Sequence, residues 1–210
     1  MPALATGAPI RFDSGSDLRA LASCRRDRVR FVDIPQKRYL AIDGHEVPGS
    51  AEFVACIGAL YGTAYPLHFT LRRRGIRGHR VGMLEGLYWL TPAQLLADET
   101  AADPSRAWSW RLLIALPDEA TENEVDAAVA GAGELGARMF IDTWAEGPSA
   151  QILHVGSYAD ETPTLRRLHA AIEEAGFSPH GPHHEIYLND PQRAGEERTK
   201  TVLRQAVMPV

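Results

Sequence analysis

The stretch HHEIYLNDP, residues 183–191, places one carboxylate inside a short run of strand-forming residues that ends in a turn. Successive side chains of a β-strand point to opposite faces, so we expect Ile186 and Leu188 to face a core. The other face then carries His183, Glu185 and Tyr187. An acidic side chain between an imidazole and a phenol is a candidate catalytic group. The alternative is a solvated edge strand whose glutamate faces water.

The composition is that of an ordinary soluble globular protein, with 45% hydrophobic and 23% charged residues in a chain of 210. This length fits one large domain or two small fused modules. A formal net charge of -5 argues against nucleic-acid binding, which needs a basic surface. The arginines between positions 72 and 80 are better explained as a solvated helix end, where cations complement the helix dipole. We therefore expect no nucleic-acid partner.

Several classes of site are missing from the sequence. Cys24 and Cys56 have no C-x-x-C spacing, which excludes a disulfide framework and a thiolate zinc site. The spacing of the eight histidines does not match a metal-binding motif. The sequence also has no nucleophile elbow, phosphate loop or dinucleotide fingerprint. No segment reaches the roughly 20 apolar residues that a membrane helix needs. We expect a cytoplasmic protein with no metal, no cofactor and no membrane partner.

The chain divides into an N-terminal arm and one domain. Residues 1–28 mix small, polar and charged types, and are too few for a DNA-binding helix-turn-helix with a linker. Residues 29–210 form the domain, in which halves of about 29–116 and 117–210 each read as strand, helix, strand, strand. Such halves usually pair through their sheets. The predicted fold class is α+β, with an antiparallel sheet, helices on one face and a ligand cleft on the other.

Local signals place the helices of this domain. Ser50 is a candidate N-cap for the first one, and Pro66 should bend or interrupt it. Thr121 and Glu124 form a capping-box pattern that opens the next. Residues 92–102 have a helical or looped character.

All four tryptophans of the chain lie in predicted strands. Large aromatic rings around a cleft bind flat, apolar ligands by stacking and area burial, whereas the alternative is that the rings are core. Because their strands can share a face, we expect Trp89, Trp110 and Trp144 to line the cleft. The other expected ligand-binding residues are Tyr65, Phe69, Met83, Glu85, Phe140 and His183.

A carboxylate acting as a general base is the chemistry that remains. The unperturbed pKa of a glutamate, about 4.3, is too low for an efficient base near neutrality, but an apolar, aromatic wall raises it. Glu185 is the first candidate base and Glu85 the second. Tyr187, Tyr158 or Tyr65 could donate a hydrogen bond to an oxyanion that forms across the cleft. The expected catalytic residues are Glu185, Tyr158 and Tyr187.

Three motifs resemble the GyrI-like small-molecule-binding family: residues 185–191, the opening from Ile34 to Gly44, and EGLYW at 85–89. The resemblance runs from about residue 29 to the C-terminus. It implies a duplicated β-α-β-β (SHS2-like) fold with the ligand cleft between the halves. Members include ligand-sensing domains of multidrug-responsive regulators, where the glutamate matching Glu185 meets cationic aromatic drugs. The stand-alone, tryptophan-rich layout resembles the cyclopropanoid cyclopropyl hydrolases, which hydrolyse DNA-alkylating natural products.

Three functional hypotheses follow from this resemblance. In the first, the cleft stacks a flat spirocyclopropyl-dienone and Glu185 activates a water that opens the cyclopropane. In the second, the protein binds and sequesters hydrophobic drugs without turnover, and an ionised Glu185 attracts cationic ligands. The third is a gyrase-inhibitor-like role in protein binding, for which an aromatic cleft is unnecessary. In each case we expect a monomer or a weak dimer, and for the first two a flat, aromatic, hydrophobic small molecule as partner.

Overall fold

The computed structural model describes residues 10–14, 17–90 and 108–210, so the segment 92–102 lies outside the described residues. Its strands are β1 (Asp13–Ser14), β2 (Arg30–Ile34), β3 (Lys37–Gly44), β4 (Leu84–Trp89), β5 (Ser109–Ala115), β6 (Phe140–Trp144), β7 (Gly147–Val155), β8 (Phe177–Tyr187) and β9 (Lys200–Pro209). Its helices are α1 (Asp17–Ser23), α2 (Ala51–Arg73), α4 (Glu122–Val129), α5 (Gly133–Gly136), α6 (Thr162–Glu174) and α7 (Pro191–Ala194). Single 3-10 turns are η1 (Ala130–Ala132), η2 (Tyr158–Asp160) and η3 (Glu196–Arg198).

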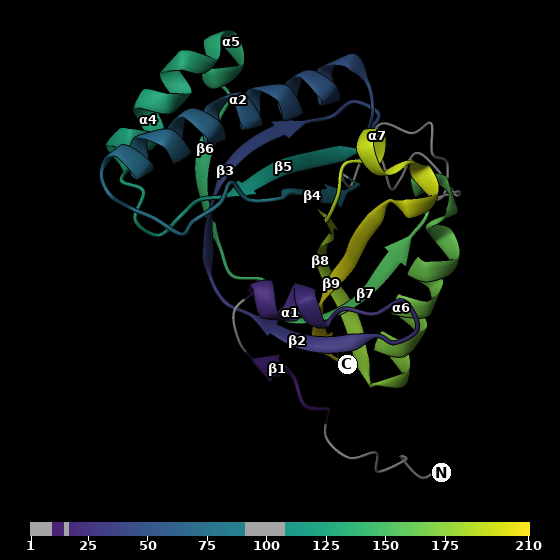
Figure 1. Ribbon diagram of the computed structural model, residues 1–210. Helices are drawn as coiled ribbons and strands as arrows, with labels where there is room; N and C mark the ends of the chain where they lie inside the picture. The colour runs from purple at the N-terminus through teal and green to yellow at the C-terminus, as the bar shows by residue number, and fades with distance from the viewer. Residues whose placement is uncertain (1–9, 15–16, 91–107) are drawn as a thin grey trace, which may run out of the picture.

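The described strands form one sheet in the order β1-β2-β7-β9-β8-β4-β5-β3-β6. Every pairing except β1 with β2 is antiparallel, and helices pack on the sheet (Figure 1). The predicted α+β fold on an antiparallel sheet is therefore confirmed. The element orders β3-α2-β4-β5 and β7-α6-β8-β9 repeat one unit, and β4 pairs with β8 at the seam between them. The boundary between the halves at about residue 116 stays a prediction.

A long two-stranded ribbon joins the halves on the side away from this seam. β2 pairs with β7 and β3 pairs with β6, and the register does not change across the break between the two ladders. Only residues 35–36 separate β2 from β3, and only residues 145–146 separate β6 from β7. The two ends of the strand order are thus brought together, and the sheet curls around its inner face.

The helices cover the opposite, outer face at two places. α2 packs over β3 and β5, while α6 packs over β7, β9 and the start of β8 at Phe177 (Figure 1). The helix-side residues of β4 and β8 lie between these two packed regions. Glu185 is one of them, so the candidate site is on the face that carries the helices, whereas the sequence placed the cleft on the other face. The reason is that the two helices stand apart, with the α2 cluster reaching Tyr88 of β4 and the α6 cluster reaching only Phe177 at the start of β8, and Glu185 lies between them.

Helix α2 begins where the sequence predicted and continues through its proline. Ser50 accepts a hydrogen bond from the backbone N–H of Phe53 at 3.2 Å, and the last turn holds Arg72 and Arg73. The sequence predicted that Pro66 bends or interrupts the helix, and the interruption is wrong because α2 runs unbroken from Ala51 to Arg73. Proline removes the hydrogen bond to the carbonyl one turn earlier, and here that carbonyl belongs to Gly62, which is exposed, so the freed carbonyl can face water.

The inner face is lined by apolar clusters and is closed in part by α1, whose Leu21 packs with Cys24, Ile186 and Val202. Of the described helices, none has both the length and the apolar character that crossing a membrane requires.

Close packing of Trp110 gives a stability prediction. The Trp110 ring is fully buried, its Nε1–H donates to the Glu46 carbonyl at 2.9 Å, and a Cβ added to Gly44 would lie 2.1 Å from its Cζ2 atom. We expect Gly44→Ala to lower the free energy of unfolding by about 1–3 kcal/mol, since overpacking forces the ring from its position. Chemical denaturation measures this.

The matched control is Gly58→Ala in α2, where an added Cβ meets nothing within 4 Å. There we expect a gain of up to about 1 kcal/mol, because alanine favours the helix over glycine. Equal destabilisation by both variants would contradict the account of Trp110.

Candidate active site

Glu185 lies at the middle of the seam, on the outer face of β8. It is paired with Leu203 of β9 on one side and Gly86 of β4 on the other. Its side chain is 16% exposed, which leaves the carboxylate mostly shielded yet reachable from solvent. A Cβ added to Gly86 would lie 2.8 Å from the hydroxyl oxygen of Tyr88, so the glycine opposite Glu185 makes room for the Tyr88 side chain.

Two tyrosines connect to this carboxylate through a chain of hydrogen bonds. The Tyr187 hydroxyl donates to Glu185 Oε2 at 2.8 Å, and the Tyr88 and Tyr187 hydroxyl oxygens are 2.5 Å apart. Because the Tyr187 proton is directed at Glu185, Tyr88 must donate to Tyr187. The Tyr158 ring packs edge-on against Tyr187, with 5.8 Å between the centroids. One carboxylate oxygen, Oε1, therefore remains available to a ligand or a water.

A second carboxyl group, Glu161, shares the electrostatics of this cluster. It is 6% exposed, and its Oε1 has no hydrogen-bond partner among the described residues. Burial, and then the charge of Glu185, raise the pKa of Glu161 to about 9. Burial also raises the pKa of Glu185, to about 7, although the Tyr187 hydrogen bond and the His184 charge act against it. Near neutral pH the proton of the pair thus resides on Glu161, which lacks those two stabilising partners.

The tyrosines of the cluster stay protonated at neutral pH. Burial and the negative charge of Glu185 raise the pKa of Tyr158 to about 12. The same two causes raise the pKa of Tyr88 and of Tyr187 well above the usual value. All three phenols are therefore hydrogen-bond donors, as an oxyanion or a carboxylate partner requires.

His154 of β7 fixes the segment that carries Tyr158 and Glu161. Its Nε2 lies 3.0 Å from the Ser157 carbonyl and its Nδ1 lies 3.0 Å from the Thr164 hydroxyl. A carbonyl only accepts, so Nε2 donates to Ser157, and Nδ1 is hydrogen-bonded to the Thr164 hydroxyl. One imidazole thus anchors both ends of the segment over the outer face.

On the inner face, directly behind Glu185, a network of buried charges spans both halves. His184 Nε2 is 3.1 Å from Glu85 Oε2, and its Nδ1 is 3.0 Å from Glu146 Oε2. Glu146 also accepts from Arg204 at 3.0 Å, and Lys37 lies 3.3 Å from Glu85. Both nitrogens of His184 face carboxylates, which only accept, so the ring is an imidazolium.

The pKa shifts agree with this geometry. Burial alone would lower the pKa of His184, but the carboxylates of Glu146 and Glu85 raise it to about 9. Burial would raise the pKa of Glu146, yet the charges of His184 and Arg204 hold it below the usual value. Glu85 is thus a partner of a permanent cation on the inner face, away from Glu185.

The structure brings together four of the residues that the sequence predicted: Glu185, Tyr187, Tyr158 and His183. His183 Nε2 lies 3.7 Å from Glu185 Oε1. The tryptophans do not gather around them. Trp110 is fully buried beneath α2, edge-on to Phe53.

The other predicted ligand-binding residues lie elsewhere. Trp89, Trp144, Met83 and Glu85 belong to the inner face, where the Trp144 ring is 5.5 Å from His184. The reason is strand alternation, because neighbours in a strand point to opposite faces and paired residues share a face. Tyr88 pairs with Trp110 on the outer face, so Trp89, which pairs with Ser109, points to the inner face. Phe140 lies under the Arg111 guanidinium on β6. Tyr65 and Phe69 are about half exposed on α2.

Sequence reasoning missed Tyr88, Glu161, His184, Glu146 and Arg204. Tyr88 had a signal: alternation in EGLYW puts it on the face opposite Glu85, and the pairing of β4 with β8 makes that the face of Glu185. Glu161 and Glu146 stand in short connections whose course depends on the tertiary fold. No local pattern places them.

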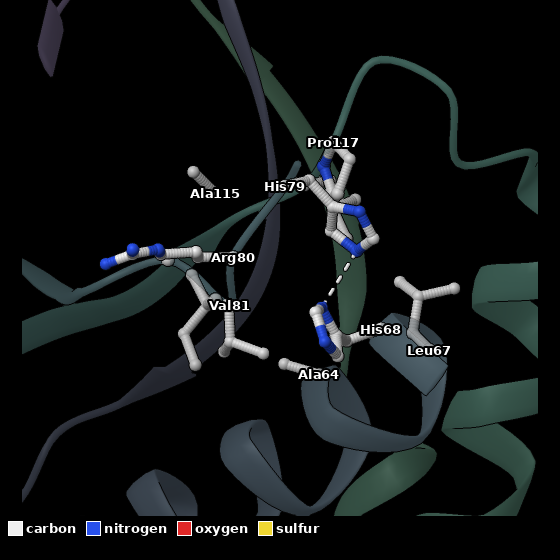
Figure 2. Close-up of a pocket in the computed structure, with 11 residues that line it drawn as sticks. Ala64, Leu67, His68, His79, Arg80, Val81, Ala115 and Pro117 are labelled. Carbon is white, nitrogen blue, oxygen red and sulfur yellow. Dashed lines mark hydrogen bonds between the residues drawn. The ribbon is translucent and has the colours of Figure 1, made fainter. Parts of the chain in front are cut away.

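A cavity beneath the C-terminal part of α2 is separate from this cluster. Figure 2 shows His68 and His79 facing each other in it, with His68 Nδ1 3.0 Å from His79 Nε2. The cavity holds about one water molecule, which is too small for a polycyclic ligand. Within the described residues, no group of three or more His, Cys, Asp or Glu side chains could hold a metal ion.

Comparison with known proteins supports the expected resemblance. The chain is similar to an uncharacterized conserved protein from Listeria innocua, with a TM-score of 0.79 and 26% identity over 93% of this chain and 100% of that one. A structure described as a hydrolase from Listeria innocua gives a TM-score of 0.73 and 25% identity over the same shares. The C-terminal domain of EcmrR shares the fold, with a TM-score of 0.55, 12% identity, and 87% and 98% coverage.

No curated protein matches the chain. Residues 114–206 match the family model described as the GyrI-like small molecule binding domain, so the part of the chain that holds Glu185, Tyr187 and Glu161 resembles that family as the sequence predicted.

Proposed function

We propose that this protein is a hydrolase that opens the cyclopropane ring of DNA-alkylating spirocyclopropyl-dienone natural products by adding water. Such a reaction destroys the alkylating electrophile and serves self-protection or detoxification. The similarity to a structure described as a hydrolase supports hydrolysis, and the family match supports the binding of a small molecule. The substrate class comes from the resemblance of the sequence motifs.

The observation that carries the proposal is the hydrogen-bonded chain from Tyr88 through Tyr187 to Glu185. It holds one carboxylate oxygen in place and leaves the other free, on a group whose pKa burial raises to about 7. A base is most efficient when its pKa is near the working pH. Glu185 meets that condition, and an exposed glutamate does not.

The proposed reaction begins with Glu185 taking a proton from water as the water oxygen attacks the cyclopropane methylene carbon. The bond between that carbon and the spiro carbon breaks, and its electron pair moves into the dienone. The dienone becomes a phenolate, and the attacked carbon becomes a primary alcohol. No oxidant, metal or cofactor takes part in these steps.

The negative charge that develops on the dienone oxygen needs a donor. Tyr158 stays protonated and is 45% exposed, so it can donate a hydrogen bond to a bound ligand. Glu161, whose raised pKa keeps it neutral, supplies the proton that converts the phenolate to a phenol. Proton exchange with solvent then returns both carboxyl groups to their starting states.

A second function uses the same cluster without chemistry. The protein would bind and sequester flat aromatic drugs, with an ionised, shielded Glu185 attracting a cationic ligand. Calorimetry with lipophilic cations, in parallel with product analysis on the dienone, separates the two functions. Tight cation binding without any ring-opened product favours sequestration.

Replacing the base should abolish turnover while leaving the fold intact. We expect Glu185→Gln to reduce the rate of ring opening by about 10²–10⁴-fold, the usual worth of a general base. The amide oxygen can still accept from Tyr187, so the site keeps its hydrogen bond. Mass spectrometry of the water-added product measures the yield.

Glu174→Gln, an exposed change on α6, is the matched control and should retain wild-type yield. A reaction without protein corrects for spontaneous solvolysis. Equal yields from wild type and Glu185→Gln would remove Glu185 from the mechanism.

The pH dependence of turnover should report both carboxyl groups. Glu185 works only when deprotonated, so the rate should rise through about pH 7 as its proton leaves. The rate should fall again above about pH 9, where Glu161 loses the proton that it donates. Glu161→Gln should lower the rate and remove the alkaline fall but keep the rising limb. A rising limb near pH 4.5 would show that Glu185 is not perturbed.

A further inference from the structure

His183 stands beside Glu185 on the outer face of β8. It pairs with Tyr88 of β4 and Gln205 of β9, so it lies one row along the sheet from the carboxylate. Both of its ring nitrogens are buried, and neither has a hydrogen-bond partner among the described residues. Buried polar atoms in native proteins almost always have a partner, which is protein, ligand or ordered water.

The ring of His183 is neutral at any working pH of the protein. Burial, followed by the charges of His184 and His169, lowers its pKa to about 3, while Glu146 acts in the opposite direction. A neutral imidazole has one N–H donor and one acceptor nitrogen. It can therefore hold a water without competing with Glu185 for the proton.

The spacing between His183 and Glu185 fits one bridging molecule. Nε2 and Oε1 are 3.7 Å apart, beyond a direct hydrogen bond, yet each can lie about 2.8 Å from one water oxygen. Oε1 is also the carboxylate oxygen that Tyr187 leaves free. The unused hydrogen-bonding capacity of both side chains thus converges on one point.

We propose that His183 and Glu185 jointly hold the attacking water, with His183 Nε2 and Glu185 Oε1 as its two protein partners. This inference rests on the proposed function. The water gives one proton to Glu185 Oε1 while its oxygen forms the new bond to the methylene carbon. His183 fixes the direction of the oxygen lone pair and does not change its own protonation state.

Two other roles for His183 give different kinetics. A side chain that tunes Glu185 would shift the rising limb of the pH profile when replaced. A side chain that only contacts the ligand would change KM and leave kcat nearly constant. Positioning of the water predicts a loss in kcat alone.

The experiment compares His183→Phe and His183→Gln with wild type and with His180→Gln, an exposed histidine of β8 as control. We expect His183→Phe to lower kcat about 10–100-fold with KM within about twofold and the rising limb unmoved near pH 7. His183→Gln, which keeps a donor and an acceptor, should recover most of kcat. An unchanged kcat, a raised KM alone, or a shifted limb overturns the inference.

A crystal structure of the wild-type protein tests the same point without turnover. An ordered water within about 3.2 Å of both His183 Nε2 and Glu185 Oε1 supports it, and density with no such water overturns it. Wild type that holds this water but leaves the dienone intact removes the proposed substrate and keeps the water site. The two failures are therefore distinguishable.

Discussion

The buried imidazolium of His184 is the interaction on which the arrangement depends. It touches Glu85 at the seam of the two halves and Glu146 at the bend of the connecting ribbon. These are the two places where the halves meet. Removing one partner of a buried ion pair costs about 3–5 kcal/mol, because a charge is left without compensation. The paired cation therefore stabilises both the bend of the ribbon and the alignment of β4 with β8.

Strand alternation connects the ion pairs of His184 to the candidate active site. His184 and Glu185 are neighbours in β8, so one points into the buried network and the other into the outer cluster. Burial in front of the strand raises the pKa of Glu185 to about 7, although the Tyr187 hydrogen bond and the His184 cation behind the strand both act to lower it. Tyr88 crosses the same seam to reach Tyr187. A shift of β4 against β8 would break the Tyr88–Tyr187 hydrogen bond on the outer face and the His184–Glu85 contact on the inner face at once.

Sequence patterns were sufficient where the cause is local. The period of two around Glu185, the Ser50 cap and the Thr121 capping box all correspond to the structure. Patterns failed where the answer depends on which strands pair. Trp89 and Trp110 fall on opposite faces because of the register of β4 with β5, and Glu161 reaches Glu185 only through the course of the η2 segment. The prediction at Pro66 failed for a third reason, since the carbonyl that loses its hydrogen bond belongs to the exposed residue Gly62 and can face water.

The central claim is that this fold gives one carboxyl group a pKa near neutrality. The direct measurement is a ¹³C NMR titration of the glutamate side-chain carboxyl carbons, with Glu185 assigned by the signal lost in Glu185→Gln. The account predicts a midpoint near pH 7 for Glu185. A midpoint near pH 4.5, the value of an unperturbed glutamate, would contradict it.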